Sequence, residues 1–145
     1  MGTRSLTRVY DDDFGEPKQV AAIYRQYDGY PEGHGRDLAD FITSRRFVNG
    51  ISGDPTKVFN GAGCFAAALV THLKTQRNGR SGDIEAGGVY LYPLDAEPEE
   101  YTYTVTIAGP EVSLKVEDFE KTRFEGPVDE FLTTFLIDHD LESSL

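Results

Sequence analysis

The stretch that decides the fold class is YTYTVTIAGPEVSLKV, residues 101–116. Aromatic and β-branched residues alternate with threonine from Tyr101 to Ile107, and residues 112–116 continue the alternation. Alternation of this kind is typical of β-strands. Ala108-Gly109-Pro110 separates the two segments with residues that turns prefer. The stretch therefore predicts two neighbouring strands joined by a short hairpin connection.

Further strands are predicted on both sides of this pair. Residues 89–92 and 122–125 carry short strand signals. The chain also begins with two strand-like segments, 3–10 and 19–27, which are separated by a turn rich in Asp, Gly and Pro. The N-terminal residues are therefore predicted to form a second hairpin.

Three segments have helical signals instead. Residues 36–45 space their apolar residues every three or four positions, and Gly126-Pro127 opens the clearest amphipathic stripe in the chain. A helix is also predicted over residues 62–75, and its interior, residues 64–70, is apolar on nearly all sides, which predicts that this helix is buried. The segments 47–60 and 76–88 are predicted to be loops, and the second is expected to be mobile.

The order of these elements predicts one α+β domain over residues 1–145. We expect an antiparallel β-sheet of about five to six strands, with three helices packed mainly on one face. The residues after His139 are polar and are expected to fray. A chain of 145 residues with 39% hydrophobic residues has the size and composition of one globular domain.

The composition excludes several classes of protein. The net charge of −11 argues against a general binder of DNA, RNA or anionic membranes, because such binders present basic surfaces. A single Cys excludes an intramolecular disulfide and a cysteine-rich zinc site. There is no apolar run of about 18 residues and no apolar signal-peptide core at the N-terminus. We therefore expect a cytoplasmic protein, in the host cytoplasm if a phage encodes it.

The charge is divided unevenly along the chain. Residues 1–82 contain 11 Lys and Arg against 9 Asp and Glu, a net charge of +2. Residues 83–145 contain 3 Lys and Arg against 16 Asp and Glu, a net charge of −13. Either the second half simply has solvated acidic surfaces, or the two halves have different binding roles. In the second case, an anionic ligand binds in the N-terminal half and the C-terminal half repels nucleic acid or engages a basic partner.

The densest polar and aromatic segment is YRQYDGYPEGHG, residues 24–35. Tyrosine offers a stacking face, arginine a planar donor group for phosphate or carboxylate, and glycine lets backbone amides approach a ligand. These are the components of a site for a nucleotide or small anion, although half-buried tyrosines at a strand end would give the same pattern. Neighbouring residues of a strand point to opposite faces, so not all of them can serve one pocket. The candidate ligand-binding residues here are Tyr24, Arg25, Gln26, Tyr27, Tyr30 and His34, to which the first strand adds Arg4.

A second candidate lies at the start of the predicted helix 62–75. Residues 60–66, NGAGCFA, match the dinucleotide-binding pattern G-x-G-x-x-A. That motif requires a parallel βαβ unit, whereas this chain predicts antiparallel hairpins, so a Rossmann site is not expected. The amides of a glycine-rich helix N-terminus can still bind an anion, and close packing of small residues is the alternative explanation. Asn60, which is also the expected N-cap, Gly61 and Gly63 complete the candidate ligand-binding residues.

No complete set of catalytic or metal-binding residues is recognisable. Cys64 has His34 and His72 as candidate bases, but its apolar neighbours predict a buried thiol without a catalytic role. The histidines, including His139, lack the spacing of metal ligands, and Asp11-Asp12-Asp13 lacks the pattern of a calcium-binding loop. We therefore predict a protein that is not an enzyme and that uses no metal and no cofactor.

Several segments resemble a small family of phage and bacterial proteins. They are MGTRSLT (1–7), residues 23–35, FNGAGC (59–64), GVYLYP (88–93) and EYTY (100–103). The resemblance covers most of the chain, and YRQYDGYP is its most specific part. It implies no activity and no functional residue. It does imply a small acidic protein of phage kinship that serves host takeover or counter-defence, and such proteins more often sequester than catalyse.

The leading hypothesis is a non-enzymatic binding protein that sequesters a nucleotide-derived or other small anionic ligand. Arg4 and Arg25 would bind its phosphate, and tyrosines would stack on its base. The alternative is an acidic inhibitor protein that blocks a basic surface of a host nucleic-acid enzyme, with Glu97, Glu99 and Glu100 among the residues involved. The sequence leaves open whether a ligand pocket lies within one chain or between the protomers of a homo-oligomer.

Overall fold

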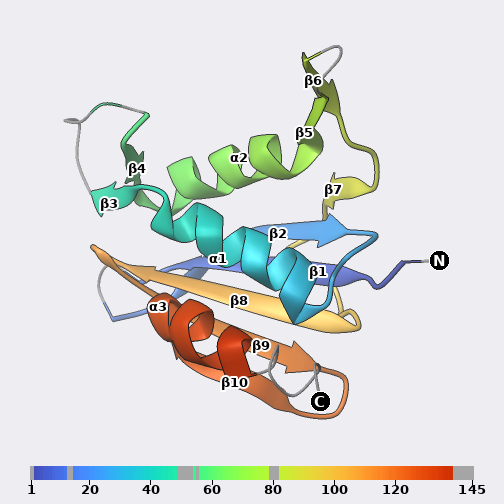
Figure 1. The fold of residues 1–145 in the computed structure, drawn as a ribbon. Coiled ribbons are helices and arrows are strands. Elements are labelled where there is room, and N and C mark those ends of the chain that lie inside the picture. Colours follow the sequence, from blue (N-terminus) through green and yellow to red (C-terminus); the bar gives the residue numbers. More distant parts are fainter. Residues whose placement is uncertain (1, 13–14, 49–53, 55, 79–81, 139–145) are drawn as a thin grey trace.

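A six-stranded sheet in the order β10-β9-β8-β1-β2-β7 forms the centre of the fold (Figure 1). The computed structural model describes residues 2–12, 15–48, 54, 56–78 and 82–138, and the side chains of these residues except 76–78 and 82–85. The strands of the sheet are β1 (Ser5–Asp11), β2 (Lys18–Arg25), β7 (Val89–Leu91), β8 (Tyr101–Ala108), β9 (Glu111–Asp118) and β10 (Thr122–Pro127).

The hairpin predicted over residues 101–116 is present. β8 and β9 pair antiparallel from Tyr101 opposite Asp118 to Ala108 opposite Glu111. Gly109 in the turn has φ +62°, a conformation that glycine adopts without a steric penalty. Val105 on β8 and Leu114 and Val116 on β9 are buried on the side that faces the helices. The α+β class predicted from this stretch is confirmed.

One pairing in the sheet differs from the expectation of a wholly antiparallel sheet. β1 pairs with β8 in parallel, from Ser5 opposite Tyr101 to Asp11 opposite Ile107, so the sheet is mixed. Parallel neighbours require a long crossover connection, and here the chain between β2 and β8 supplies it. The signals within each strand are local and carry no information about this long-range pairing.

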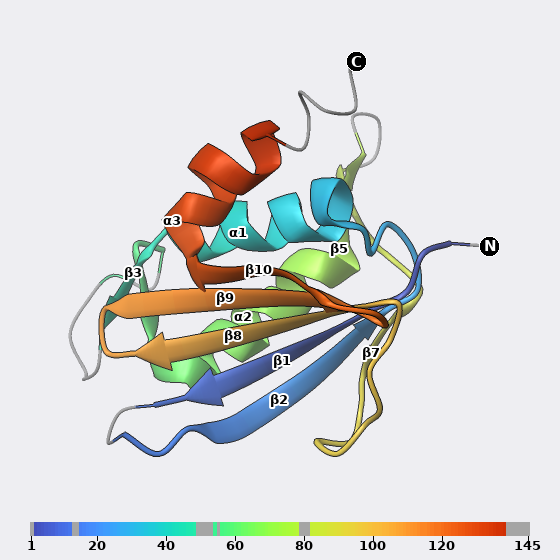
Figure 2. The same cartoon turned by 90° about the horizontal axis from the view of Figure 1, so that it is seen from below.

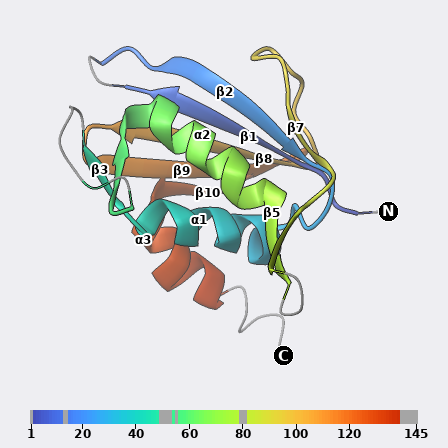
Figure 3. The same cartoon turned by 90° about the horizontal axis from the view of Figure 1, so that it is seen from above.

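Three helices cover one face of the sheet. α2 (Gly61–Lys74) lies over the β1 and β2 side and α1 (Arg36–Thr43) beside it, while α3 (Val128–Glu130) continues directly into η2 (Phe131–Phe135). Figure 2 shows the opposite face of the sheet with strands in front and α2 behind them, and Figure 3 shows the helices in front of the strands. The expectation of three helices on one face is confirmed. The largest fully buried side chains between the layers are Tyr103, Phe59, Phe65 and Phe131.

Two segments predicted as loops contain short strands. β3 (Arg46–Val48) and β4 (Val58–Asn60) form a parallel pair, and β5 (Thr75–Asn78) and β6 (Gly82–Glu85) form an antiparallel pair. The prediction of loops over 47–60 and 76–88 is therefore wrong at these strands. Strands of three or four residues are too short to show alternation. The predicted fraying after His139 lies outside the described residues.

The expectation that the second helix is buried on nearly all sides is wrong. Phe65, Leu69 and Leu73 of α2 face the core, but Gly63, Cys64, Ala67 and Thr71 are exposed. Most residues on the outer side are small, so the sequence is apolar there without being buried. The thiol of Cys64, which the sequence predicts to be buried, is exposed for this reason.

No helix in the described ranges is long and apolar enough to span a membrane.

Candidate functional site

A buried polar cluster lies where β1 and β2 meet the start of α1. Ser5, Thr7 and His34 are each 0% exposed. His34 comes from η1 (Pro31–Gly35), the single π-helical turn that leads directly into α1. Turns of this kind are rare and are often found at functional sites. Because buried polar groups cost free energy unless they are hydrogen-bonded, their partners decide what the cluster can do.

The contacts of His34 fix its protonation state. Arg25 Nη1 lies 3.2 Å from His34 Nδ1, and Thr7 Oγ1 lies 2.7 Å from Nε2. Arginine can only donate, so Nδ1 accepts and the ring proton is on Nε2, which donates to Thr7. Burial, together with the positive charge of Arg25, lowers the pKa of His34 to about 3. His34 is therefore a neutral imidazole at physiological pH.

Asp37 on α1 connects Arg25 with His72 on α2. One carboxylate oxygen is 3.4 Å from Arg25 Nη1, and the other is 2.7 Å from His72 Nε2. The hydrogen bond from His72 lowers the pKa of Asp37, although partial burial opposes the shift. The His72 ring is stacked on Phe41 at a centroid distance of 4.4 Å. The side chains of Asp37 and His72 are 37% and 38% exposed, so they form the solvent-facing end of the cluster.

The contacts within this cluster leave few accessible hydrogen-bonding groups for a ligand. The Arg25 side chain is only 13% exposed, and its charge faces Asp37. Arg25 Nε and Ser5 Oγ have no hydrogen-bond partner, but both are buried and thus inaccessible to a nucleotide-sized molecule. Within the described part of the chain, no hydroxyl or thiol is hydrogen-bonded to His72. No group of three potential metal ligands occurs among the described residues.

The glycine-rich turn also proves to be packed against protein. The amides of Gly33 and Gly35 donate to Tyr30 O, and that of His34 donates to Asp28 O. A Cβ on Gly33 would lie 2.5 Å from Asp28 O, and one on Gly35 would lie 2.9 Å from Phe131 Cζ. The amides that the sequence suggested for ligand contact are therefore used inside the protein. Close packing accounts for both glycines.

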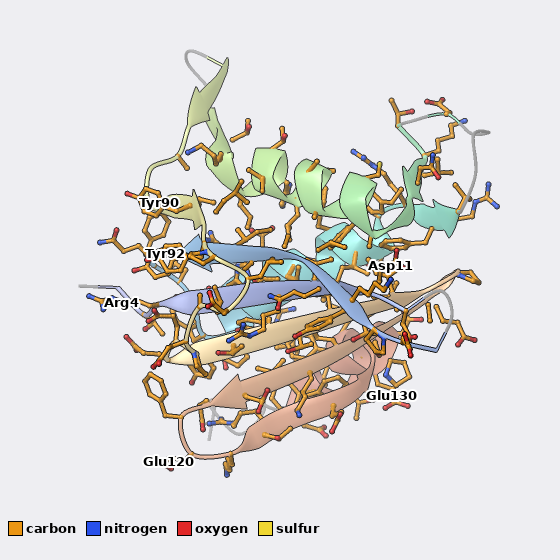
Figure 4. The ribbon with its side chains drawn as sticks, turned by 180° about the vertical axis from the view of Figure 1, so that it is seen from behind. Arg4, Asp11, Tyr90, Tyr92, Glu120 and Glu130 are labelled. Atoms are coloured by element: carbon orange, nitrogen blue, oxygen red, sulfur yellow. The ribbon has the colours of Figure 1, made fainter. Side chains whose placement is uncertain are left out.

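Tyr24 lies on the opposite face of the sheet from Arg25. It is 7% exposed and stacks on Tyr92 with a centroid distance of 4.6 Å and an interplanar angle of 6°. Burial raises the pKa of Tyr24, and the positive charge of Arg4 opposes the shift. In Figure 4, Arg4, Tyr90 and Tyr92 lie at the same end of the sheet. The structure thus separates Arg4 and Tyr24 from Arg25 and His34, as strand alternation requires.

The remaining sequence-predicted residues lie in two further places. Tyr27 donates to Gly87 O, and Tyr30 donates to Asp28, both near the end of β2, where Gln26 is exposed. Asn60, Gly61 and Gly63 lie at the start of α2. Asn60 occupies the expected N-cap position, but its side chain makes no capping hydrogen bond. At about 1.5 Å per residue, Gly61 is about 16 Å along the helix from His72. The structure does not bring the ten candidates into one site.

A cavity of about 750 Å³ lies at the other end of α1 from His34. Its wall combines the C-terminal end of α1, the β8–β9 hairpin and the junction of β10 with α3. Ligand sites of small molecules usually have volumes of about 300–1,000 Å³. Apolar side chains, among them Phe47, Val112 and Val128, line the cavity together with Arg45, Arg46, Glu111 and Asp129. None of the ten sequence-predicted residues contributes to this wall.

The two arginines of the cavity are available for a ligand. Arg45 lies over the Phe59 ring, with 4.9 Å from Cζ to the ring centroid, and over the Phe41 ring at 5.6 Å. This stacking holds the guanidinium in place without using its hydrogen-bonding edge. Among the described residues, neither Arg45 nor Arg46 has a carboxylate within 4.0 Å. The sequence signal that could have indicated them is an Arg-Arg pair directly after an amphipathic helix.

Comparisons with protein-family models, curated proteins and solved structures give no match to this chain.

Proposed function

We propose that the protein binds a small organic anion in the cavity at the C-terminal end of α1. The supporting observation is that Arg45 and Arg46 line a cavity of about 750 Å³. Among the described residues, neither arginine has a carboxylate partner. Arg25, by contrast, is paired with Asp37 and largely buried. The ligand class is that of the sequence hypothesis, whereas the proposed location is different.

The wall of the cavity narrows the chemistry of the ligand. The arginines suit a phosphate or carboxylate, because the guanidinium can donate two parallel hydrogen bonds to either group. Phe47, Val112 and Val128 suit a flat or apolar body. Glu111 and Asp129 accept hydrogen bonds from hydroxyl or amino groups. A phosphorylated nucleoside combines all three features, and the proposed role is to bind and sequester such a molecule without catalysis.

Isothermal titration calorimetry tests the proposal with defined probes. The panel consists of linear and cyclic nucleotides, with the unphosphorylated nucleosides as neutral controls. At least one phosphorylated probe is expected to bind with a Kd below about 100 μM, and its neutral nucleoside is expected to bind at least about tenfold more weakly. A panel in which no nucleotide binds more tightly than about 100 μM would overturn the proposal.

Four variants locate the site. Arg46→Ala and Arg45→Ala should each weaken binding by about 10- to 100-fold, the usual range for losing a hydrogen bond to a charged group. Lys121→Ala removes an exposed positive charge far from the cavity and should leave the Kd unchanged. Arg4→Ala distinguishes the cavity from the tyrosine site on the opposite face. A loss of affinity in Arg4→Ala alone would place the ligand at Tyr24 and contradict the cavity.

A further inference from the structure

The end of β7 and its connection to β8 form an exposed ridge, defined here as residues 90–100. The chain leaves β7 at one edge of the sheet and runs over β2 and β1, on the face without helices, before it enters β8 (Figure 4). Three large apolar side chains on it face solvent: Tyr90 is 52% exposed, Leu91 71% and Leu94 48%. Single exposed apolar residues are ordinary, but three within five positions indicate a contact surface.

The ridge is held in one conformation by the sheet beneath it. Arg8 on β1 donates to Ala96 O at 2.7 Å and to Leu94 O at 3.3 Å. The Tyr92 amide donates to Ala22 O of β2 at 2.8 Å, and the Tyr92 ring is stacked on Tyr24. A segment that is ordered before binding loses little conformational entropy on association. The ridge therefore presents Leu91 and Leu94 as a preformed surface.

The ridge is also acidic. Asp95, Glu97, Glu99 and Glu100 follow the apolar residues within a few positions. None of these carboxylates forms an ion pair with a described Lys or Arg within 4.0 Å. Arg8 is directed at backbone carbonyls instead, and Arg4 is a second cation on this side of the sheet. An apolar centre with a charged rim is the usual composition of a protein interface.

We propose that the ridge docks into a partner protein whose apolar groove is rimmed by Lys and Arg. Charge complementarity selects this occupant. Nucleic acids and anionic membranes are repelled by the four carboxylates, and a second copy of the chain would bring net charges of −11 together. The leucines supply the buried contact, while the carboxylates steer the encounter and fix its orientation. This surface lies apart from the cavity and does not depend on the small-molecule ligand.

Affinity capture with three variants of the full chain tests the ridge. The immobilised protein is exposed to an extract of the cells in which it is normally made, and bound proteins are quantified by mass spectrometry. Leu91→Ser/Leu94→Ser removes the apolar contact, and Glu97→Lys/Glu99→Lys/Glu100→Lys reverses the charge. Glu120→Lys/Glu125→Lys/Glu130→Lys is the matched control, since it reverses three exposed charges elsewhere.

The expected result is a partner that both ridge variants bind at least tenfold more weakly and that the control variant retains. After purification, this partner should dissociate as salt rises and should form chemical cross-links within residues 90–100. Equal capture by all four proteins, or no capture at low salt, would overturn the proposal. So would self-association in sedimentation velocity that Leu91→Ser/Leu94→Ser abolishes, because the occupant would then be a second copy. Circular dichroism of each variant verifies folding.

Discussion

Substitution by alanine should lower the stability of the protein at Gly35, at the start of α1, and raise it at Gly63, in the first turn of α2. Gly35 has ordinary helical dihedrals, with φ −59° and ψ −47°, so alanine meets no backbone strain there. Its new Cβ would, however, lie 2.9 Å from Phe131 Cζ and 3.2 Å from Tyr103 Cε1. Both rings are 0% exposed, so neither can move aside into solvent. Overpacking of this kind costs about 1–3 kcal/mol.

Gly63 is the matched control, because a Cβ built on it meets nothing within 4 Å. Alanine in the first turn of α2 should stabilise the protein by about 0.5 kcal/mol, since glycine loses more backbone entropy on folding. Urea unfolding followed by circular dichroism measures both effects. With an m-value of about 2 kcal/mol/M, the midpoint should fall by about 0.5–1.5 M in Gly35→Ala and rise slightly in Gly63→Ala.

A double-mutant cycle with Phe131→Leu tests the cause. Leucine lacks the ring atoms nearest to the new methyl group, so Gly35→Ala should cost less free energy in that background than in the wild type. Equal midpoints for Gly35→Ala and Gly63→Ala would refute the reasoning. So would strictly additive effects in the cycle, since the destabilisation would then not come from contact with Phe131.

Three further predictions concern the polar cluster and Cys64. In the unfolded state, His34 binds a proton near the ordinary histidine pKa of 6.5, whereas in the folded state its pKa is about 3. The free energy of unfolding should therefore fall by up to about 1.4 kcal/mol per pH unit as the pH drops between these two values. Urea titrations from pH 7 to 4 should show a flatter profile for His34→Gln, and an unchanged slope would exclude a buried neutral histidine. Thr7→Val should destabilise the protein by about 1–3 kcal/mol, because it leaves the Nε2 proton of His34 without an acceptor. Ser5→Ala removes a hydroxyl without a partner and should be nearly neutral. A larger loss of unfolding free energy in Ser5→Ala than in Thr7→Val would contradict this assignment. Cys64 should react with a thiol reagent in the folded protein at one equivalent per chain, and reaction only after denaturant is added would show that the thiol is buried.

Most of the fold could be predicted because its longer helices and strands have clear patterns in their local sequence. The alternation in β8 and β9 and the stripe that begins at Val128 reflect which side chains face the core. The parallel pairing of β1 with β8 could not be predicted, since it joins segments far apart in the chain. The exposure of Cys64 was missed because α2 has small apolar residues on its outer side, which resemble buried ones in sequence.

The candidate site was less predictable than the fold. Residues 24–35 were candidates because of their chemistry, but the structure uses much of that chemistry internally, in the contacts of His34 and in the packing of Gly35 against Tyr103 and Phe131. Arg45 and Arg46 match no recognised binding motif, and their sequence signal is only that two arginines follow an amphipathic helix. They become candidates only because three distant segments enclose a cavity beside them, which is a property of tertiary structure.

The position of β1 also determines when the chain can fold. β1 and β2 form one local hairpin and β8, β9 and β10 form another local unit, but the sheet is continuous only after Ser5 has found Tyr101. During synthesis, the N-terminal hairpin must therefore wait, with one edge of β1 unpaired, until β8 has left the ribosome. Long-range pairing of this kind slows folding and leaves an open strand edge for aggregation. A circular permutant whose chain begins at β8 would make β1 only after β8 has been synthesised, with only β9, β10 and the C-terminal helix between the two paired strands, and would remove that wait.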